Sequence, residues 1–188
     1  MKKGWIIGIV VVVLLVIYGA SSYNGLVSAS EDVDNKWSQV DNQLKRRADL
    51  IPNLVETVKG YASHETEAIK AVSDARSKLA GANSTEDAIE ADQELSGALS
   101  RLLVVVENYP DLKANENFKG LMDSLEGTEN RLTVARKDYN DEVTNYNKMI
   151  KRFPKNMMAG AFGFDAKPYF EVTDQEKETP KVDFGSDK

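Results

Sequence analysis

The chain of 188 residues contains no cysteine and a single histidine, His64. The lack of cysteine excludes disulfides, thiolate metal sites and a cysteine nucleophile. One histidine is too few for the two Glu-x-x-His motifs of a carboxylate-bridged di-iron bundle. We also find no phosphate-binding loop, dinucleotide fingerprint or nucleophile elbow. We therefore expect no enzymatic activity, no metal and no cofactor, and we interpret His64 as a surface or capping residue.

Basic residues are outnumbered by acidic ones, with 24 Lys and Arg against 30 Asp and Glu and a net charge of −6. Lys2 and Lys3 are the only charged residues before Glu31, so the rest of the chain is more acidic than the whole. Binding to nucleic acid requires a basic surface that can neutralise phosphates. The composition therefore argues against a nucleic-acid partner.

Charge is absent from residues 4–20, GWIIGIVVVVLLVIYGA. Together with residues 21–23, this stretch makes about 30 Å of helix at 1.5 Å per residue, enough to cross the apolar core of a bilayer. Trp5 lies near one end and Tyr18 and Tyr23 near the other, where interfacial aromatic residues are typical. The pattern predicts a transmembrane anchor in residues 1–23, so the lipid bilayer is one expected partner.

The charges that flank this span predict its orientation. Lys2 and Lys3 precede it and Glu31 and Asp32 follow it, which by the positive-inside rule places the N-terminus in the cytoplasm and the body outside. A cleaved signal peptide is the alternative, because small residues at positions 19–21 resemble a cleavage site. The span is, however, long for a signal sequence. A GxxxG spacing at its extreme end is too weak to support a homo-oligomer.

Beyond residue 33 the apolar residues follow a seven-residue period typical of packed helices. The first such stripe comprises Trp37, Leu44, Ile51, Val58, Val72 and Leu79. Pro52 interrupts it and should kink or break the helix. Because the repeat keeps its phase across Pro52, we favour one continuous kinked helix that ends at Gly81.

Two more long helices are expected downstream. Ser84, with Asp87 three residues later, predicts the start of the second, which closes at residues 109–110 and should be most buried along the apolar run 102–106. The third should run over residues 115–152. The aromatic residues between 157 and 170 lack a period and predict an irregular segment over one end of the bundle, followed by a disordered acidic tail at residues 173–188.

These patterns define the expected fold class and domain boundaries. The fold is all-α: an elongated antiparallel bundle of three long helices, or four if Pro52 breaks the first, preceded by one transmembrane helix. The anchor occupies residues 1–23, the bundle with its aromatic segment residues 24–172, and the tail residues 173–188.

Several blocks of the sequence resemble the LemA family in order along the chain. They are NKWSQVDNQLKRRADLIPNLVETVKGYASHE from residue 35, NYPDLKANENF from residue 108, ENRLTVARKDYNDEVTNYN from residue 129, and RFP at residues 152–154. The resemblance implies a bacterial membrane protein with one N-terminal anchor and a helical-bundle domain. It implies no catalytic residues.

Charged and aromatic residues on the apolar stripes are candidates for a polar core. Arg47 lies on the first stripe. Glu142 lies on the last stripe, which repeats every seven residues along the helix expected at residues 115–152, so we expect a buried or half-buried ion pair that fixes helix register. Tyr139 and Tyr146 lie on the last stripe, where their hydroxyl groups can reach polar partners. The asparagines that follow these tyrosines are interpreted as helix-surface amides.

The block of Arg46, Arg47 and Asp49 beside Pro52 is the candidate interaction surface. Two function classes fit the sequence. The favoured one is an extracytoplasmic scaffold or interaction protein of the cell envelope that acts by contact with an unidentified membrane or envelope protein. The alternative is a sensor or adaptor that binds a peptide or small ligand at the aromatic loop of residues 157–170. Such a protein would serve a membrane protease or transport system.

The orientation is testable because the chain has no cysteine of its own. We expect the variant Ser186→Cys to react with a membrane-impermeant thiol reagent in intact cells, since the C-terminal body is predicted to lie outside. The same cells after lysis give the full extent of labelling. Labelling that appears only after lysis would show that the body faces the cytoplasm.

Overall fold

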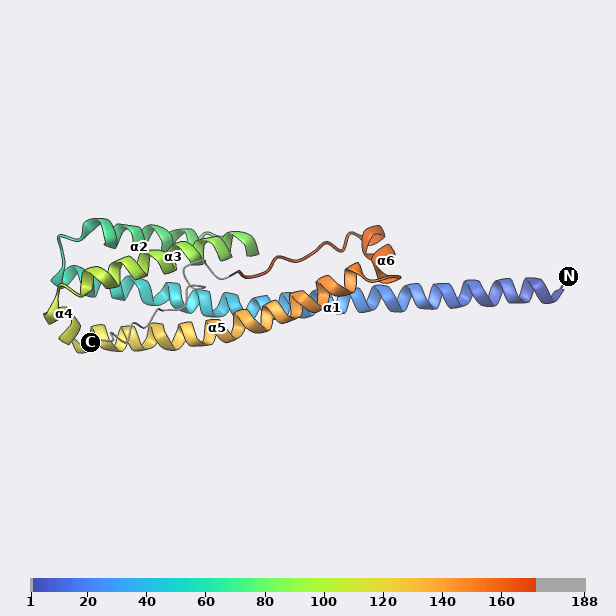
Figure 1. Cartoon of the computed structure of the whole chain (residues 1–188), viewed down its shortest axis with the longest axis horizontal. Coiled ribbons are helices and arrows are strands. Elements are labelled where there is room, and N and C mark those ends of the chain that lie inside the picture. The colour runs from blue at the N-terminus through green and yellow to red at the C-terminus, as the bar shows by residue number, and fades with distance from the viewer. Residues whose placement is uncertain (1, 172–188) are drawn as a thin grey trace, which may run out of the picture.

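The computed structural model describes residues 2–171 and consists of helices joined by short connections (Figure 1). The helices are α1 (Lys2–Tyr61), α2 (Thr66–Ala80), α3 (Thr85–Val106), α4 (Pro110–Ala114), α5 (Glu116–Lys151) and α6 (Lys155–Phe162). The described residues include no strand. The prediction of an all-helical protein is therefore confirmed.

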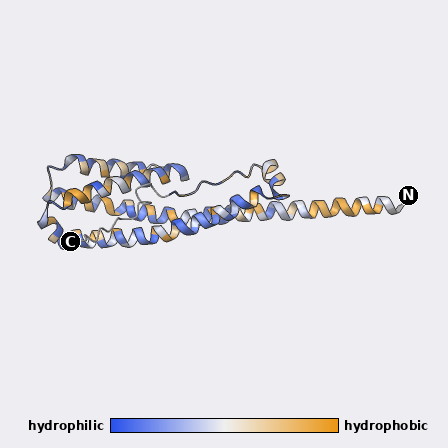
Figure 2. Ribbon diagram, in the orientation of Figure 1, coloured by the Kyte–Doolittle hydropathy of each residue, from blue (hydrophilic) through white to orange (hydrophobic). Residues whose placement is uncertain are grey.

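The N-terminal part of α1 projects from the rest of the molecule as a single helix (Figures 1 and 2). Its side chains from Trp5 to Tyr18 are exposed, and they are almost all aliphatic or aromatic. Among the described helices, α1 is the one long and apolar enough to cross a membrane. Exposed apolar side chains on a lone helix are consistent with a lipid environment.

The rest of α1 is the central element of the bundle. It packs lengthwise against α5, and the hairpin of α2 and α3 packs on the part of α1 farthest from the apolar projection (Figure 1). Residues from all four long helices form one apolar core, whose largest fully buried aliphatic members include Leu44, Leu54, Leu95, Leu102 and Leu132. α3 and α5 lie on different sides of α1 and do not pack against each other along their lengths. This separation creates the groove described below.

Pro52 lies inside α1, and the helix continues through it as expected. Proline has no backbone N–H, so the carbonyl of Ala48 loses its usual partner four residues later. Arg76 of α2 donates a hydrogen bond from Nε to that carbonyl oxygen at 3.4 Å. A side chain from the neighbouring helix thus partly satisfies the backbone group that Pro52 leaves unpaired.

The first helix is shorter than predicted, because α1 ends at Tyr61 rather than near Gly81. Residues 62–65 form a turn, and the chain returns as α2. His64 lies exposed in this turn, and the Glu65 carboxylate accepts a hydrogen bond from the Tyr109 hydroxyl at 2.9 Å. The seven-residue repeat was misleading here, since Val58 and Val72 keep its phase although they enter the core from antiparallel helices.

Local signals located most other helix ends correctly. The Ser84 hydroxyl accepts a hydrogen bond from the backbone N–H of Asp87 and caps α3. Asn115 caps α5 in the same way, and Gly81 is the C-terminal cap of α2. The prediction for the run 102–106 is wrong, because Leu102 is fully buried but Val104 is 71% exposed. The run is amphipathic, with one face open to solvent.

The aromatic residues after Pro154 are not all irregular, since residues 155–162 form α6. From Gly163, whose φ of 71° suits glycine, the chain continues without regular structure along α1 and α5 toward the start of α3 (Figure 1). The expected disorder of residues 173–188 concerns residues outside those described.

Replacing Pro52 with Ala should raise the free energy of unfolding by about 1–3 kcal/mol, because a helical N–H is restored at an exposed position. The restored N–H can bond the Ala48 carbonyl, so Arg76→Ala should cost less stability in the Pro52→Ala variant than in the unchanged chain. Urea unfolding of the four proteins of this double-mutant cycle measures both effects. A loss of stability in Pro52→Ala would show that the fold requires the proline.

Candidate functional site

Four charged side chains meet inside the bundle, around Asp92 of α3. This carboxylate is 1% exposed. Its Oδ1 accepts a hydrogen bond from Nη1 of Arg47 (α1) at 2.8 Å, and its Oδ2 pairs with Nη2 of Arg136 (α5). Glu129 of α5 completes the group, 3.2 Å from Arg47 Nη1 and 3.4 Å from Arg136 Nη1. The two arginines and two carboxylates form what we call the charge network.

The charge network is electrically balanced and links three helices. Burying one charge without a partner costs several kcal/mol, so each arginine needs its carboxylate in place. Arg47 Nη1 also donates a hydrogen bond to the Ser96 hydroxyl oxygen at 3.0 Å. Because α3 and α5 do not pack directly, Asp92 with the two arginines is the polar connection between them.

The expected pairing of Arg47 with Glu142 is wrong. Arg47 is buried as predicted, but its partners are Asp92 and Glu129, whereas Glu142 is half-buried farther along α5. Asp92 was overlooked although the sequence contains a signal for it. It lies three residues from both Ile89 and Leu95, on the buried face of α3.

A groove of about 430 Å³ adjoins the charge network, between α3 and α5. Its walls are mainly Leu99 and Leu103 of α3 and Met122 and Leu125 of α5, and Leu54 of α1 lies at its base. Arg47, Ser96 and Glu129 lie at one end, and Ser100 and Glu126 line the rest. The groove is therefore apolar with a charge-balanced end.

Tyr139 and Tyr146 are both nearly fully buried on α5. The Tyr139 hydroxyl donates to the carbonyl oxygen of Pro168 at 2.8 Å, and its ring packs edge-on against Trp37 with centroids 5.3 Å apart. Burial raises the pKa of Tyr139 to about 12 and also raises that of Tyr146. Both side chains therefore remain neutral, hydrogen-bonding members of the core at physiological pH.

The neighbouring asparagines bind the C-terminal segment, which corrects their interpretation as helix-surface amides. Asn147 donates from Nδ2 to the Lys167 carbonyl and accepts from the Lys167 N–H, each at 2.9 Å. Asn140 makes the same pair of bonds with Phe170, each at 2.8 Å. The two asparagines are seven residues apart on a helix, and the two residues that they bind are three apart in extended chain. Both separations are about 10 Å, so each asparagine lies opposite its partner. Side chains of α5 thus hold the main chain of residues 167–170.

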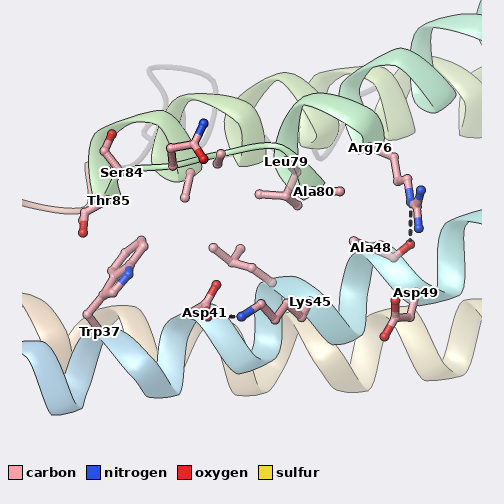
Figure 3. Close-up of a pocket in the computed structure, with 14 residues that line it drawn as sticks. Trp37, Asp41, Lys45, Ala48, Asp49, Arg76, Leu79, Ala80, Ser84 and Thr85 are labelled. Carbon is pink, nitrogen blue, oxygen red and sulfur yellow. Dashed lines mark hydrogen bonds and ion pairs between the residues drawn. The ribbon is translucent and has the colours of Figure 1, made fainter.

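The expected surface of Arg46, Arg47 and Asp49 is not a single surface. Arg46 and Asp49 are exposed three residues apart, whereas Arg47 points into the bundle. Asp49 lines a second pocket, of about 520 Å³, where the α2–α3 connection stands over α1 (Figure 3). There Lys45 is paired with Asp41 at 2.6 Å.

The only histidine and the acidic side chains are also possible metal ligands. Within residues 2–171 no cluster of three or more His, Asp or Glu side chains could hold a metal ion. His64 is exposed in the α1–α2 turn and lines neither pocket.

The residues that the structure describes thus form helices, and the N-terminal helix is apolar and long enough to span a membrane. Residues 36–184 match the model of the LemA family, and the chain belongs to this family. The resemblance noted in the sequence is thereby confirmed.

The chain is similar to magnetosome proteins and to a LemA protein. Magnetosome proteins MamQ 1 and MamQ 2 of Paramagnetospirillum magneticum are each 29% identical to this chain over 175 residues, covering 79% of this chain and 64% of their own length. Protein LemA of Metamycoplasma hominis is 23% identical, covering 82% of this chain and 71% of its own. This chain thus spans less than two thirds of the magnetosome proteins.

Removing the central carboxylate should destabilise the fold strongly. We expect Asp92→Ala to lower the free energy of unfolding by about 3–5 kcal/mol, because two buried arginines lose the carboxylate that they share and keep only the partly exposed Glu129. The control is Asp141→Ala, which breaks the exposed pair with Lys137 and should cost less than about 1 kcal/mol. Urea unfolding measures both, and equal losses would contradict a central role for Asp92.

Proposed function

We propose that the protein is a membrane-anchored, extracytoplasmic interaction protein of the cell envelope that acts by contact with another envelope protein. The groove between α3 and α5 is the observation that carries this proposal. An apolar groove bordered by fixed polar groups is a common site for a protein segment.

The dimensions of the groove favour a helical segment as its occupant. On α5 it extends from Met122 to Glu129, about 10 Å or two helical turns. A helix laid between α3 and α5 would place apolar residues at i, i+3 or i+4, and i+7 against Leu99, Leu103 and Leu125. Its polar groups would meet Ser100 and Glu126 at the rim.

The N-terminal part of α1 supports the anchored arrangement, since its exposed apolar side chains have no protein partner between Trp5 and Tyr18. The charges on either side of that span favour a body outside the cytoplasm. Arg46 and Asp49 remain proposed contacts for a partner on another side of the bundle. A homo-oligomer would be one form of such a partner.

The adaptor alternative, with a ligand at residues 157–170, is less well supported. The main chain of residues 167–170 is already held by Asn140 and Asn147. Phe170 is buried beside Trp37, and Arg136 stacks on its ring at 4.4 Å. The segment therefore behaves as a bound part of the bundle, and the apolar groove between α3 and α5 lies elsewhere.

A photo-crosslinking amino acid at Ser100, on the rim of the groove, should capture an envelope protein in native membranes. The charge substitution Leu103→Glu in the same chain should reduce that cross-link at least ten-fold, because the half-buried Leu103 lines the groove. Mass spectrometry identifies the captured protein and quantifies the product.

The matched control is Val104→Glu, which adds the same charge one residue away at an exposed side chain outside the groove. This control should leave the cross-link unchanged. Equal effects of the two substitutions, with helical content preserved, would refute the groove as the binding site.

A further inference from the structure

The end of α5 and all of α6 differ in charge from the rest of the protein. Residues 143–164 contain four basic residues, Lys148, Lys151, Arg152 and Lys155, and no acidic residue. Residues 24–142 contain 23 acidic and 14 basic residues. A local cluster of positive charge in an otherwise acidic body indicates a site for an anionic partner.

α6 places this basic stretch beside the apolar span of α1. The Tyr23 ring contacts the rings of Phe162 and Phe164, with centroid distances of 5.0 and 5.8 Å. The Met158 side chain reaches Gly19, and the Lys155 ammonium lies beside Gly25. α6 therefore lies along the last turn of the span and the first turns that follow it (Figure 1).

Three large apolar side chains in this region face solvent. Phe153 is 80% exposed, Met157 67% and Phe162 57%. Among the described residues outside the α1 span, few large apolar side chains are as exposed, and these three are grouped within ten positions. Exposed aromatic and apolar residues next to basic ones are typical of surfaces that lie in the interface of a bilayer.

The height of α6 above the span fits the headgroup layer. Gly25 lies about 3 Å along α1 beyond Tyr23, the end of the predicted anchor, and the headgroup layer on each side of the apolar core is about 5–7 Å thick. In contrast, Lys45 lies about 33 Å beyond Tyr23, several times the screening length of about 10 Å. The basic residues near Pro52 are thus too far from the surface, whereas those near α6 are close to it.

We propose that the face formed by Lys148, Lys151, Arg152, Phe153, Met157 and Phe162 binds anionic lipid headgroups of the bilayer that anchors α1. The basic side chains bind the headgroup phosphates, and Phe153, Met157 and Phe162 enter the boundary with the acyl chains. This contact attaches the protein to the bilayer at a second place besides the span. It thereby limits the orientations that the bundle can take relative to the membrane. The inference rests on the proposed anchored arrangement.

The test uses the full chain with Met157→Cys, labelled with an environment-sensitive fluorophore and reconstituted into vesicles. In vesicles with 30% phosphatidylglycerol we expect a blue-shifted emission that is quenched by spin-labelled lipids. In pure phosphatidylcholine, or after the double substitution Lys151→Glu and Arg152→Glu, the quenching should fall at least three-fold. The control label at Val134→Cys, an exposed position on α5, should remain water-like in both lipids.

The outcomes separate this inference from the anchor itself. Flotation of the vesicles and resistance to carbonate extraction report the span, and circular dichroism reports the fold of each variant. A protein that floats but carries a water-like label at residue 157 in both lipids overturns the inference and leaves the anchor intact. Equal quenching of the label in both kinds of vesicle would show that the face enters the bilayer without binding anionic headgroups, and this result also overturns the inference. Protection of the label in cell membranes but not in vesicles would assign the face to a protein partner instead.

Discussion

The arrangement of α1, α3 and α5 depends on the buried carboxylate of Asp92. α3 and α5 touch α1 from different sides and lack a continuous contact with each other. Asp92 binds Arg47 of α1 and Arg136 of α5 at once, so it fixes the rotation and axial position of all three helices. Apolar packing alone tolerates small slips between helices, whereas a buried ionic contact fixes the register, because a slip would leave a charge unpaired. The groove beside the charge network can therefore stay open without loss of a defined structure.

α5 connects the other parts of the molecule to this centre. One part of α5 carries Arg136, the next part holds the C-terminal segment through Asn140 and Asn147, and its end leads into α6. Phe170 links the first two parts, since its ring lies against the Arg136 guanidinium while its backbone is bound by Asn140. The conformation of the C-terminal segment is thus coupled to the charge network through α5.

Features that depend on local chemistry could be predicted from the sequence. The caps at Ser84 and Asn115 involve residues three apart, and the apolar span is a continuous run. Features that depend on which helices are neighbours could not. The turn at residues 62–65 preserved the apolar repeat, so the period did not reveal a reversal of direction. The partner of Arg47 and the role of Asn140 were missed for the same reason, because each binds a residue far away in sequence.

The continuity of α1 has a mechanical consequence. The same helix that forms the apolar span extends without interruption to Tyr61, about 60 Å beyond Ala20. A rigid rod of that length converts a change in the tilt of the span into a sideways movement of its far end. A tilt of about 20°, the average for membrane helices, would displace the α1–α2 turn by roughly 20 Å. In the anchored arrangement the thickness of the bilayer, which influences helix tilt, would therefore help to determine the area that the distal tip can reach.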